Sequence, residues 1–212
     1  MKKLTITLLI MIAFFFCRAQ NFNEMQPADY RMHKGLFLCL SVGPNFSEIL
    51  VKERGRYDTF YNGSGPLLDL KIGGAIKEDL ILHATLTTNF MSGPKISSNG
   101  QSQKTSDKFM IGEDFIGGGI TYYMMPSNLL FSGSIGLGNF RIVDDENDTS
   151  VSSDKGFGFQ LKVGKEWWIS RRWGLGIALS YSKLNVTNKP ETNVVETINS
   201  DNLGICINAT FN

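Results

Sequence analysis

The sequence predicts an all-β chain that forms an eight-stranded antiparallel up-and-down transmembrane β-barrel. Three observations predict this fold. Apolar and polar residues alternate with a period of two along most of the chain, as they do in strands with two different faces. The connections between these stretches are alternately long and short, which is typical of a barrel with short periplasmic turns and longer extracellular loops. One parity is apolar, whereas the other mixes acids, bases and glycines.

The first residues have the features of a secretory signal peptide. A basic start precedes the apolar run Leu4–Phe16, and a small residue, Ala19, follows it. Because this run is too short for a comfortable membrane-spanning helix, we predict that residues 1–20 are removed, with cleavage after Ala19 or Gln20. Cys17 raises a lipoprotein interpretation, but the phenylalanines before it do not fit a lipidation site. No later apolar run has the length of a membrane helix, so the exported chain is expected to be either soluble or a barrel.

The exported part divides into a short lead and one barrel domain. Residues 21–34 are polar and have no period, so we expect an N-terminal periplasmic lead in which His33 lies at the surface. Residues 35–212 contain the alternating stretches, the first of which is predicted to end at Pro44-Asn45. The predicted strands are, in chain order, Gly35–Gly43, Gly65–Ile76, Leu80–Phe90, Phe109–Met124, Leu129–Val143, Lys155–Ile169, Trp173–Leu184 and Asn202–Asn212.

Each predicted strand has one apolar parity, which we assign to the outside. A soluble barrel or sandwich would bury its apolar face instead, so alternation alone leaves this assignment open. The other parity carries charges of both signs and many glycines, which suits the narrow interior of an eight-stranded barrel. The predicted outer positions include Leu36, Leu38, Leu40, Val42, Leu68, Leu70, Ile72, Ile76, Leu80, Leu82, Ala84, Leu86, Phe90, Ile116, Ile120, Tyr122, Leu129, Phe131, Ile135, Leu137, Phe157, Phe159, Leu161, Val163, Trp167, Trp173, Leu175, Ile177, Leu179, Tyr181, Leu203, Ile205, Ile207, Ala209 and Phe211.

The connections place both ends of the barrel domain on one side of the membrane. The short connections, which we predict to be periplasmic turns, are Lys77–Asp79, Met125–Asn128 and Ser170–Arg172. The predicted outer loops are Phe46–Ser64, Met91–Lys108, Asp144–Asp154 and Asn185–Asp201. Because the number of strands is even, the last strand is expected to pair with the first and close the barrel.

Charged and polar side chains of the inner parity form the predicted polar network of the lumen. Its members are Asp69, Lys71, His83, Glu113, Gln160, Lys162 and Glu166. An unpaired charge inside a barrel is costly, so we expect these groups to pair with one another. The alternative is that they line a path for protons or ions.

Aromatic residues beside the short turns form the predicted interfacial girdle on the periplasmic side. They are Tyr122, Tyr123, Trp167, Trp168, Trp173 and Phe211. Lys165 does not fit the apolar outer face, because it has outward parity. It lies close to Trp167 in sequence, so we expect its side chain to extend toward the periplasmic headgroups. A β-bulge at this position is the alternative.

Charge and cysteine content exclude several classes of protein. The chain has 21 basic and 20 acidic residues, and loss of the basic signal peptide leaves a net charge of about −2. Nucleic acid is therefore not expected as a partner, because its binding needs a basic excess. The exported part keeps Cys39 and Cys206, too few for a disulfide-stapled scaffold. They fall on the inner parity of neighbouring strands, so a cross-strand disulfide is conceivable, although two buried thiols are favoured.

Three segments carry a resemblance to a known group of proteins. They are Ala19-Gln20, the segment Gly43–Ser47 and the terminal strand, in which Gly204, Ile207 and Phe211 are similar to the C-terminal signal read by the barrel-assembly machinery. The chain resembles the small eight-stranded outer-membrane β-barrel proteins, the group of the OmpA barrel, OmpX and OmpW. It resembles more closely the porin-like barrel proteins of Bacteroidetes, including the PorT family. The resemblance implies a place in the outer membrane of the cell envelope, with membrane lipid and the assembly machinery as partners.

A lipid-modifying or protease barrel is the least favoured alternative, and no residue pattern indicates a cofactor or a metal. A covalent mechanism needs a nucleophile beside a base. His83 is the histidine on a predicted strand, whereas Ser132 and Ser134 lie on a strand that is not adjacent to its own. The acidic segment Asp144–Asp148 lacks the glycine and the distal glutamate of a calcium-binding loop.

Three functions therefore remain after the sequence analysis. The first is an integral outer-membrane barrel with a largely filled lumen and a structural, surface-interaction or accessory role, whose loops would meet a surface protein or polysaccharide. The second is a narrow porin-like channel for ions or small solutes. The third is a soluble secreted periplasmic barrel or sandwich. Fold does not choose between them.

Overall fold

The strands of the structure are longer than the stretches that the alternation predicts. The computed structural model describes residues 32–53, 55–144, 149–188 and 195–212, so the predicted signal peptide and most of the lead lie outside the described residues. Among the described residues, no helix is long and apolar enough to cross a membrane. The strands are β1 (Leu36–Glu53), β2 (Thr59–Lys77), β3 (Leu80–Ser98), β4 (Gln101–Lys104), β5 (Phe109–Met124), β6 (Leu129–Asp144), β7 (Thr149–Ser152), β8 (Gly156–Trp168), β9 (Trp173–Asn188) and β10 (Glu196–Phe211).

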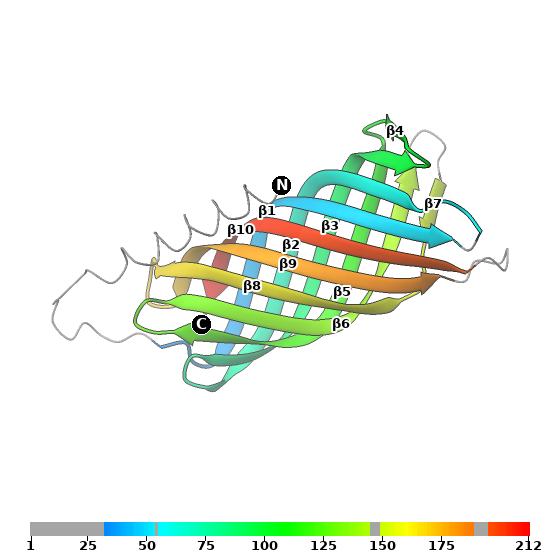
Figure 1. Cartoon of the computed structure of the whole chain (residues 1–212). Helices are drawn as coiled ribbons and strands as arrows, with labels where there is room; N and C mark the ends of the chain where they lie inside the picture. The colour runs from blue at the N-terminus through cyan, green and yellow to red at the C-terminus, as the bar shows by residue number, and fades with distance from the viewer. Residues whose placement is uncertain (1–31, 54, 145–148, 189–194) are drawn as a thin grey trace. The chain divides into compact units, whose positions relative to one another are not determined.

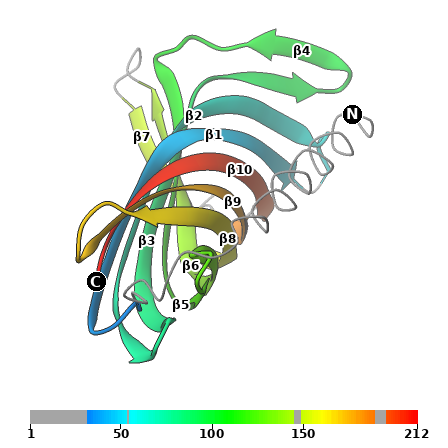
Figure 2. The ribbon, with the colours of Figure 1, turned by 90° about the vertical axis from the view of Figure 1, so that its left-hand side faces the viewer.

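Eight of these strands close into one antiparallel barrel, as predicted (Figures 1 and 2). The pairing order runs from β2 through β1, β10, β9, β8, β6 and β5 to β3, and β3 pairs back with β2. The last strand lies against the first over most of their length, from Leu38 opposite Phe211 to Glu53 opposite Glu196. β4 pairs with β3 and β7 with β6, so these short strands extend the sheet at one end of the barrel (Figure 1).

Three of the predicted outer loops are mostly strand. The prediction placed Phe46–Ser64, Met91–Lys108 and Asn185–Asp201 outside the sheet. In the structure β1 continues to Glu53, β2 begins at Thr59, β3 reaches Ser98, β9 reaches Asn188 and β10 begins at Glu196. Apolar and polar residues do not alternate regularly there, so the period-two signal is lost while the neighbouring strands still satisfy the backbone hydrogen bonds. The barrel wall therefore continues well beyond its apolar part.

The predicted end of the first strand at Pro44-Asn45 is wrong. Pro44 lies inside β1, opposite Pro66 of β2. On its other side, β1 pairs with β10 at Val42 and again at Asn45, with no paired residue at Pro44. Proline lacks the amide hydrogen that a ladder needs, so the chain tolerates it at this interruption.

The two ends of the barrel differ in their connections. One end, called the turn end here, carries the short turns Glu78-Asp79, Met125–Asn128 and Ile169–Arg172 together with the C-terminal Phe211. The opposite end, called the loop end, carries the β3–β4 and β6–β7 hairpins. Asn99 and Gly100 form the tip of the β3–β4 hairpin with positive φ angles of 49° and 75°, as a tight two-residue turn requires.

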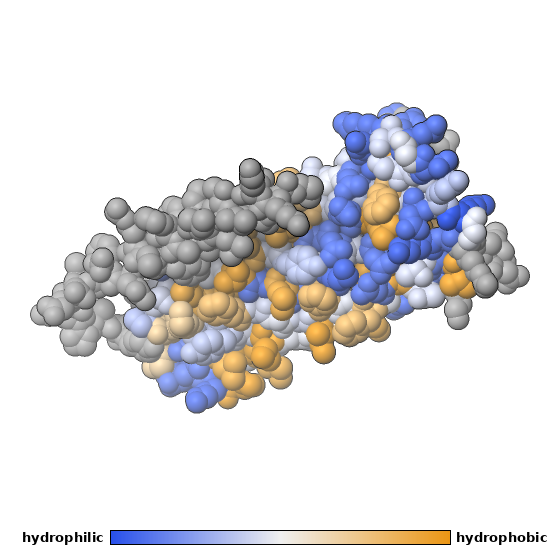
Figure 3. All heavy atoms as spheres, in the orientation of Figure 1, coloured by the Kyte–Doolittle hydropathy of each residue, from blue (hydrophilic) through white to orange (hydrophobic). Residues whose placement is uncertain are grey.

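The outer face of the strands carries an apolar belt at the turn end. Figure 3 shows apolar side chains over the strands of the visible face and polar ones toward β4. Leu203, Ile205 and Ile207 are all exposed, as are their counterparts on the other strands. Toward the loop end, the first outward position after the belt is polar in, or directly before, each barrel strand, and apolar outward residues such as Leu50, Phe90 and Met110 recur only further along. These polar border residues are Glu48, Ser64, Thr88, Asp114, Asn139, Lys155, Lys183 and Asp201.

The interior of the barrel has three layers. At the turn end lies an apolar cluster, called the turn-end cluster, made of Phe37, Cys39, Ile81, Tyr123 and Leu130. At the loop end lies a second one, the loop-end cluster, made of Ile49, Met91, Ile111, Phe140, Leu184, Val186 and Ile198. Between them along the strands are the buried polar and charged side chains. The polar layer is therefore flanked on both sides by apolar packing.

Candidate functional site: the filled interior

The centre of the polar layer is a buried carboxylate between two ammonium groups. Lys162 donates a hydrogen bond to Asp69, and the Lys71 Nζ lies 3.7 Å from the Asp69 Oδ1. Thr87 donates a further hydrogen bond of 2.7 Å to the same carboxylate. All these side chains are buried, and they come from β2, β3 and β8. Two lysine ammonium groups thus share one carboxylate in the interior of the barrel.

Gln160 and serine hydroxyls connect this group across the interior. The Lys71 Nζ donates to the Gln160 Oε1 at 2.6 Å, and the Lys162 Nζ donates to the Ser41 Oγ at 2.9 Å. The Gln160 amide nitrogen donates to the Asp69 Oδ1 at 3.2 Å. The predicted residues Asp69, Lys71, Gln160 and Lys162 therefore form one hydrogen-bonded group.

His83 belongs to a neighbouring group of hydroxyls. Its Nδ1 lies 3.1 Å from the Thr85 Oγ1, and its Nε2 lies 3.0 Å from the Thr121 Oγ1 and 3.4 Å from the Ser132 Oγ. The sequence analysis placed His83 and Ser132 on strands that are not adjacent, and they lie on β3 and β6. The structure brings them together across β5, where Gly119 has no side chain. A Cβ atom there would lie 2.9 Å from the imidazole Cε1.

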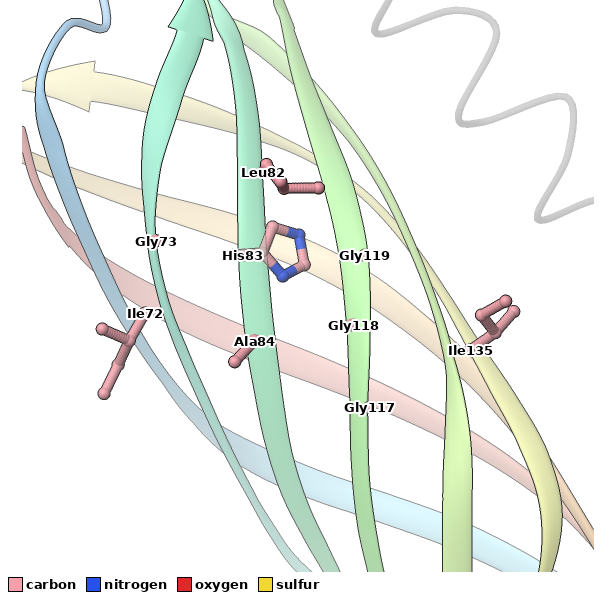
Figure 4. A pocket seen from close by; sticks show the side chains of 9 residues that line it. All are labelled: Ile72, Gly73, Leu82, His83, Ala84, Gly117, Gly118, Gly119 and Ile135. Atoms are coloured by element: carbon pink, nitrogen blue, oxygen red, sulfur yellow. The ribbon is translucent and has the colours of Figure 1, made fainter.

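Glycines of β5 also leave a groove on the outer face of the barrel wall. Figure 4 shows Gly117, Gly118 and Gly119 along β5, with the apolar side chains of neighbouring strands around them. The groove has a volume of about 630 Å³, and Ile72, Leu82, Ala84 and Ile135 belong to its lining. Apart from the buried His83, its side chains are those of the apolar belt, so it is a shallow part of the outer surface.

Glu113 forms a third group, which lies nearer the loop end. The Asn202 amide nitrogen is 2.9 Å from both of its carboxylate oxygens, and the Asn89 amide nitrogen is 3.3 Å from the Oε1. The Asn202 Oδ1 accepts from Ser47 at 2.6 Å. Glu113 forms no ion pair among the described residues, so neutral side chains, the two amides and the Ser200 hydroxyl, hold this carboxyl group.

Glu166 lies apart from the other predicted network residues, toward the turn end. Its Oε1 accepts a hydrogen bond of 2.8 Å from the Thr210 Oγ1. The two cysteines lie in the same part of the interior. Cys39 and Cys206 are both buried free thiols, so the conceived disulfide is not formed.

The turn end of the interior contains a histidine that the sequence analysis placed at the surface. His33 is 0% exposed, and its ring stacks on Tyr123 with 3.5 Å between ring centroids. Its backbone nitrogen donates to the Asp79 Oδ1 and its Nε2 lies against the Asn128 Oδ1, both at 2.9 Å. Burial lowers the pKa of His33, while Asn128 and Asp79 act in the opposite direction. Nothing in the lead has a period that would reveal this docking.

Two members of the predicted girdle face inward instead. Tyr123 is 1% exposed, and the Trp168 ring lies 4.7 Å from the His33 ring. Each follows an exposed aromatic, Tyr122 or Trp167, and successive residues of a strand point to opposite faces. The girdle prediction is therefore wrong for Tyr123 and Trp168, because it counted both members of each pair.

The remaining aromatics of the predicted girdle lie on the outer face at the turn end. Trp173 is exposed and meets Phe211 edge-on, with 5.3 Å between the ring centroids. Lys165 extends in the predicted direction: its Nζ donates to the Ser127 carbonyl oxygen in a short turn at 3.0 Å. The pairing of β8 with both neighbours keeps its register at Lys165, so the alternative of a bulge is wrong.

The interior offers few groups for chemistry on a substrate. Ser132 and His83 are buried, and the other imidazole nitrogen meets the hydroxyl of Thr85, where a catalytic triad would have a carboxylate. Among the described residues, no group of three or more histidine, cysteine or acidic side chains is arranged to hold a metal. The acidic loop residues 145–148 lie outside the described residues.

Comparison with known proteins identifies the fold of this chain. No protein-family model matches the sequence, and no curated protein matches it. Among solved structures, the outer membrane protein OprG from Pseudomonas aeruginosa is similar with a TM-score of 0.54 and 12% identity, over 86% of this chain and 98% of that one. Neisserial surface protein A is similar with a TM-score of 0.50 and 14% identity, over 82% of this chain and 96% of that one. The chain thus has the fold of small outer-membrane barrels.

Proposed function

We propose that this chain is an integral outer-membrane barrel with a filled interior, which acts as a structural or surface-interaction protein. The observation that carries the proposal is the reversed polarity of the barrel. Its outer face is apolar, whereas its interior holds Asp69, Lys71 and Lys162. Water would solvate such an outer face poorly, and contiguous exposed apolar surface of this extent marks contact with a membrane or a partner.

The length of the apolar belt supports insertion in a membrane. On β10 the outward apolar positions run from Leu203 to Phe211, and on β1 from Leu36 to Phe46. A tilted strand needs about 9–11 residues to cross the hydrocarbon core. The short turns and the exposed aromatics Tyr122, Trp167 and Trp173 lie at one border of the belt, where interfacial aromatics are expected.

The wall beyond the belt supports a role at the cell surface. β1, β2, β3, β9 and β10 all continue past the polar border residues, and the β3–β4 and β6–β7 hairpins extend the sheet further. A surface protein or polysaccharide is the class of partner that such an extension would meet. We propose no enzymatic activity, because the buried Ser132–His83 contact has neither access nor an orienting acid.

Membrane fractionation with a matched pair of variants tests the proposal. Ile205 and Asn199 both point outward from β10, the first within the belt and the second beyond it. Arginine costs roughly 2–4 kcal/mol at the membrane midplane and about 0–1 near the interface. Ile205→Arg should therefore reduce the yield of membrane-embedded protein with heat-modifiable gel mobility, whereas Asn199→Arg should leave it unchanged. Mature wild-type protein that stays soluble without detergent would overturn the proposal.

A further inference from the structure

A groove on the outer wall crosses the border of the apolar belt between β3, β5, β6 and the start of β8. It has a volume of about 380 Å³. Its apolar part is lined by Leu86, Ile116 and Leu137, which lie next to one another in the strand register. We call it the border groove, and this part of it belongs to the apolar belt.

The other part of the border groove is polar. Its lining includes Thr88, Asp114, Asn139 and Lys155, which are four of the polar border residues. Thr88 and Asp114 face each other in the register of β3 and β5, and Asp114 faces Asn139 in that of β5 and β6. The groove therefore changes from apolar to polar at the level where a membrane would change from acyl chains to headgroups.

Within the described part of the chain, the charges of the polar part leave one cation without an ion-pair partner. Thr88 donates to the Asp114 Oδ1 at 2.9 Å, and the Arg141 Nη2 lies 3.1 Å from the Asp114 Oδ2. Both carboxylate oxygens are thus engaged. Lys155 is exposed and forms no ion pair with any described residue. Because Arg141 neutralises Asp114, the ammonium group of Lys155 is the cation of the groove that has no ion-pair partner among the described residues.

From these features we infer that the border groove binds a phosphorylated lipid of the outer leaflet. The acyl chain lies along Leu86, Ile116 and Leu137, and the phosphate meets Lys155 and the Asn139 amide. A charge-assisted hydrogen bond from an ammonium group to a phosphate is stronger than one between neutral groups. The inference rests on the proposed membrane insertion, which sets the orientation of a lipid at this wall.

Binding of dioleoyl phosphatidic acid to the purified full chain in dodecyl maltoside micelles, measured by native mass spectrometry, tests the inference. Lys155→Glu should weaken binding about tenfold, which corresponds to the loss of one charge-assisted hydrogen bond. The control is Lys104→Glu, an exposed lysine of β4 outside the groove, which should bind like the wild type. Dioleoylglycerol, which has the same chains and no phosphate, should bind as weakly as phosphatidic acid binds to Lys155→Glu.

Three results would overturn the inference. They are equal binding by the Lys155→Glu variant and the wild type, equal binding of the two lipids, and displacement of the lipid by millimolar inorganic phosphate, which would indicate a site for the free anion. Heat-modifiable gel mobility of the same samples shows that each variant is folded. A wild type that is heat-modifiable but binds neither lipid contradicts the inference alone, whereas a wild type that is soluble and not heat-modifiable contradicts the proposed function.

Discussion

At the scale of single residues, the polar layer depends on an unequal set of charges. Asp69 accepts from Lys162 and lies close to Lys71, so one acid serves two buried cations. The Gln160 Oε1 accepts a hydrogen bond from Lys71 as well. Removing the acid would leave both ammonium groups without a counterion, whereas removing Lys162 would leave an intact acid–base pair.

The Asp69→Asn variant should therefore lose about 3–5 kcal/mol of unfolding free energy, the range for breaking a buried pair. Lys162→Met should lose less, because Lys71 still neutralises Asp69. Urea unfolding of the protein in lipid vesicles measures both values. Asp201→Asn serves as the control, since the exposed Lys183–Asp201 pair should contribute about 0–1 kcal/mol. Equal losses for Asp69→Asn and Asp201→Asn would contradict the assigned role of the buried carboxylate.

The burial of the His33 side chain at the turn end depends on pH. Burial lowers its pKa from the ordinary value of 6.5. Between that value and the lowered one, the undocked imidazole holds a proton that the docked imidazole lacks. Docking is therefore complete above about pH 6.5 and weakens as the pH falls below it.

Hydrogen exchange at the His33 amide, which donates to Asp79, measures this effect. We expect its protection, corrected for intrinsic exchange, to decrease from pH 7 to pH 5 in the wild type. In His33→Phe an aromatic ring can still stack on Tyr123, but it cannot take up a proton, so its protection should not vary over this range. The same pH dependence in both proteins would assign the effect to another group.

At the scale of the elements, glycine on the inner face lets side chains cross the barrel. A Cβ atom on Gly119 would lie 2.2 Å from the Gly133 carbonyl oxygen and 2.5 Å from the Ser134 Oγ. Its neighbour Gly118 points outward, where the nearest atom to an added Cβ would be the His83 carbonyl oxygen at 3.9 Å. An added side chain would therefore clash at Gly119, whereas the adjacent Gly118 has room for one.

Gly119→Ala should destabilise the barrel by about 1–3 kcal/mol, because the added methyl group overfills a packed interior. Gly118→Ala should change the unfolding free energy by no more than about 0.5 kcal/mol. Urea unfolding in vesicles compares the two variants directly. If both alanines were tolerated equally, the close packing of His83 and Ser134 against β5 would be refuted.

At the scale of the whole molecule, closure of the sheet makes an interior that side chains fill. The turn-end cluster and the loop-end cluster lie on either side of the polar layer. An eight-stranded barrel has room for little more than its own side chains. The buried charges therefore have their partners among the other side chains of the interior.

Planar bilayer recordings test this consequence against the narrow-channel hypothesis. Inserted wild-type protein should give no steady single-channel current in molar salt. A barrel in which Met91 and Phe140 are both replaced by alanine should also stay closed, because the turn-end cluster remains. Steady ion-selective openings of the wild type would favour the channel and would contradict a filled interior.

The sequence predicted the strand number and faces well, because these depend on local alternation. Leu203, Ile205 and Ile207 lie on the outer face as expected, and Asp69 and Lys162 lie inside. It failed where alternation stops or misleads. The first strand was predicted to end at Pro44, but it continues, because a break in the ladder tolerates proline. Tyr123 was predicted to face outward, because its proximity to a turn was given more weight than its parity.

The sequence specifies the number of barrel strands, their order and the polarity of each face, since these follow from a period of two and from the placing of turns. Which side chains meet across the interior follows from the tertiary structure alone. Lys71 reaches Gln160, His83 reaches Ser132 and His33 reaches Asn128. These contacts join residues far apart in the chain. Their distances depend on the register of the strands and on closure of the barrel, and no local pattern encodes either.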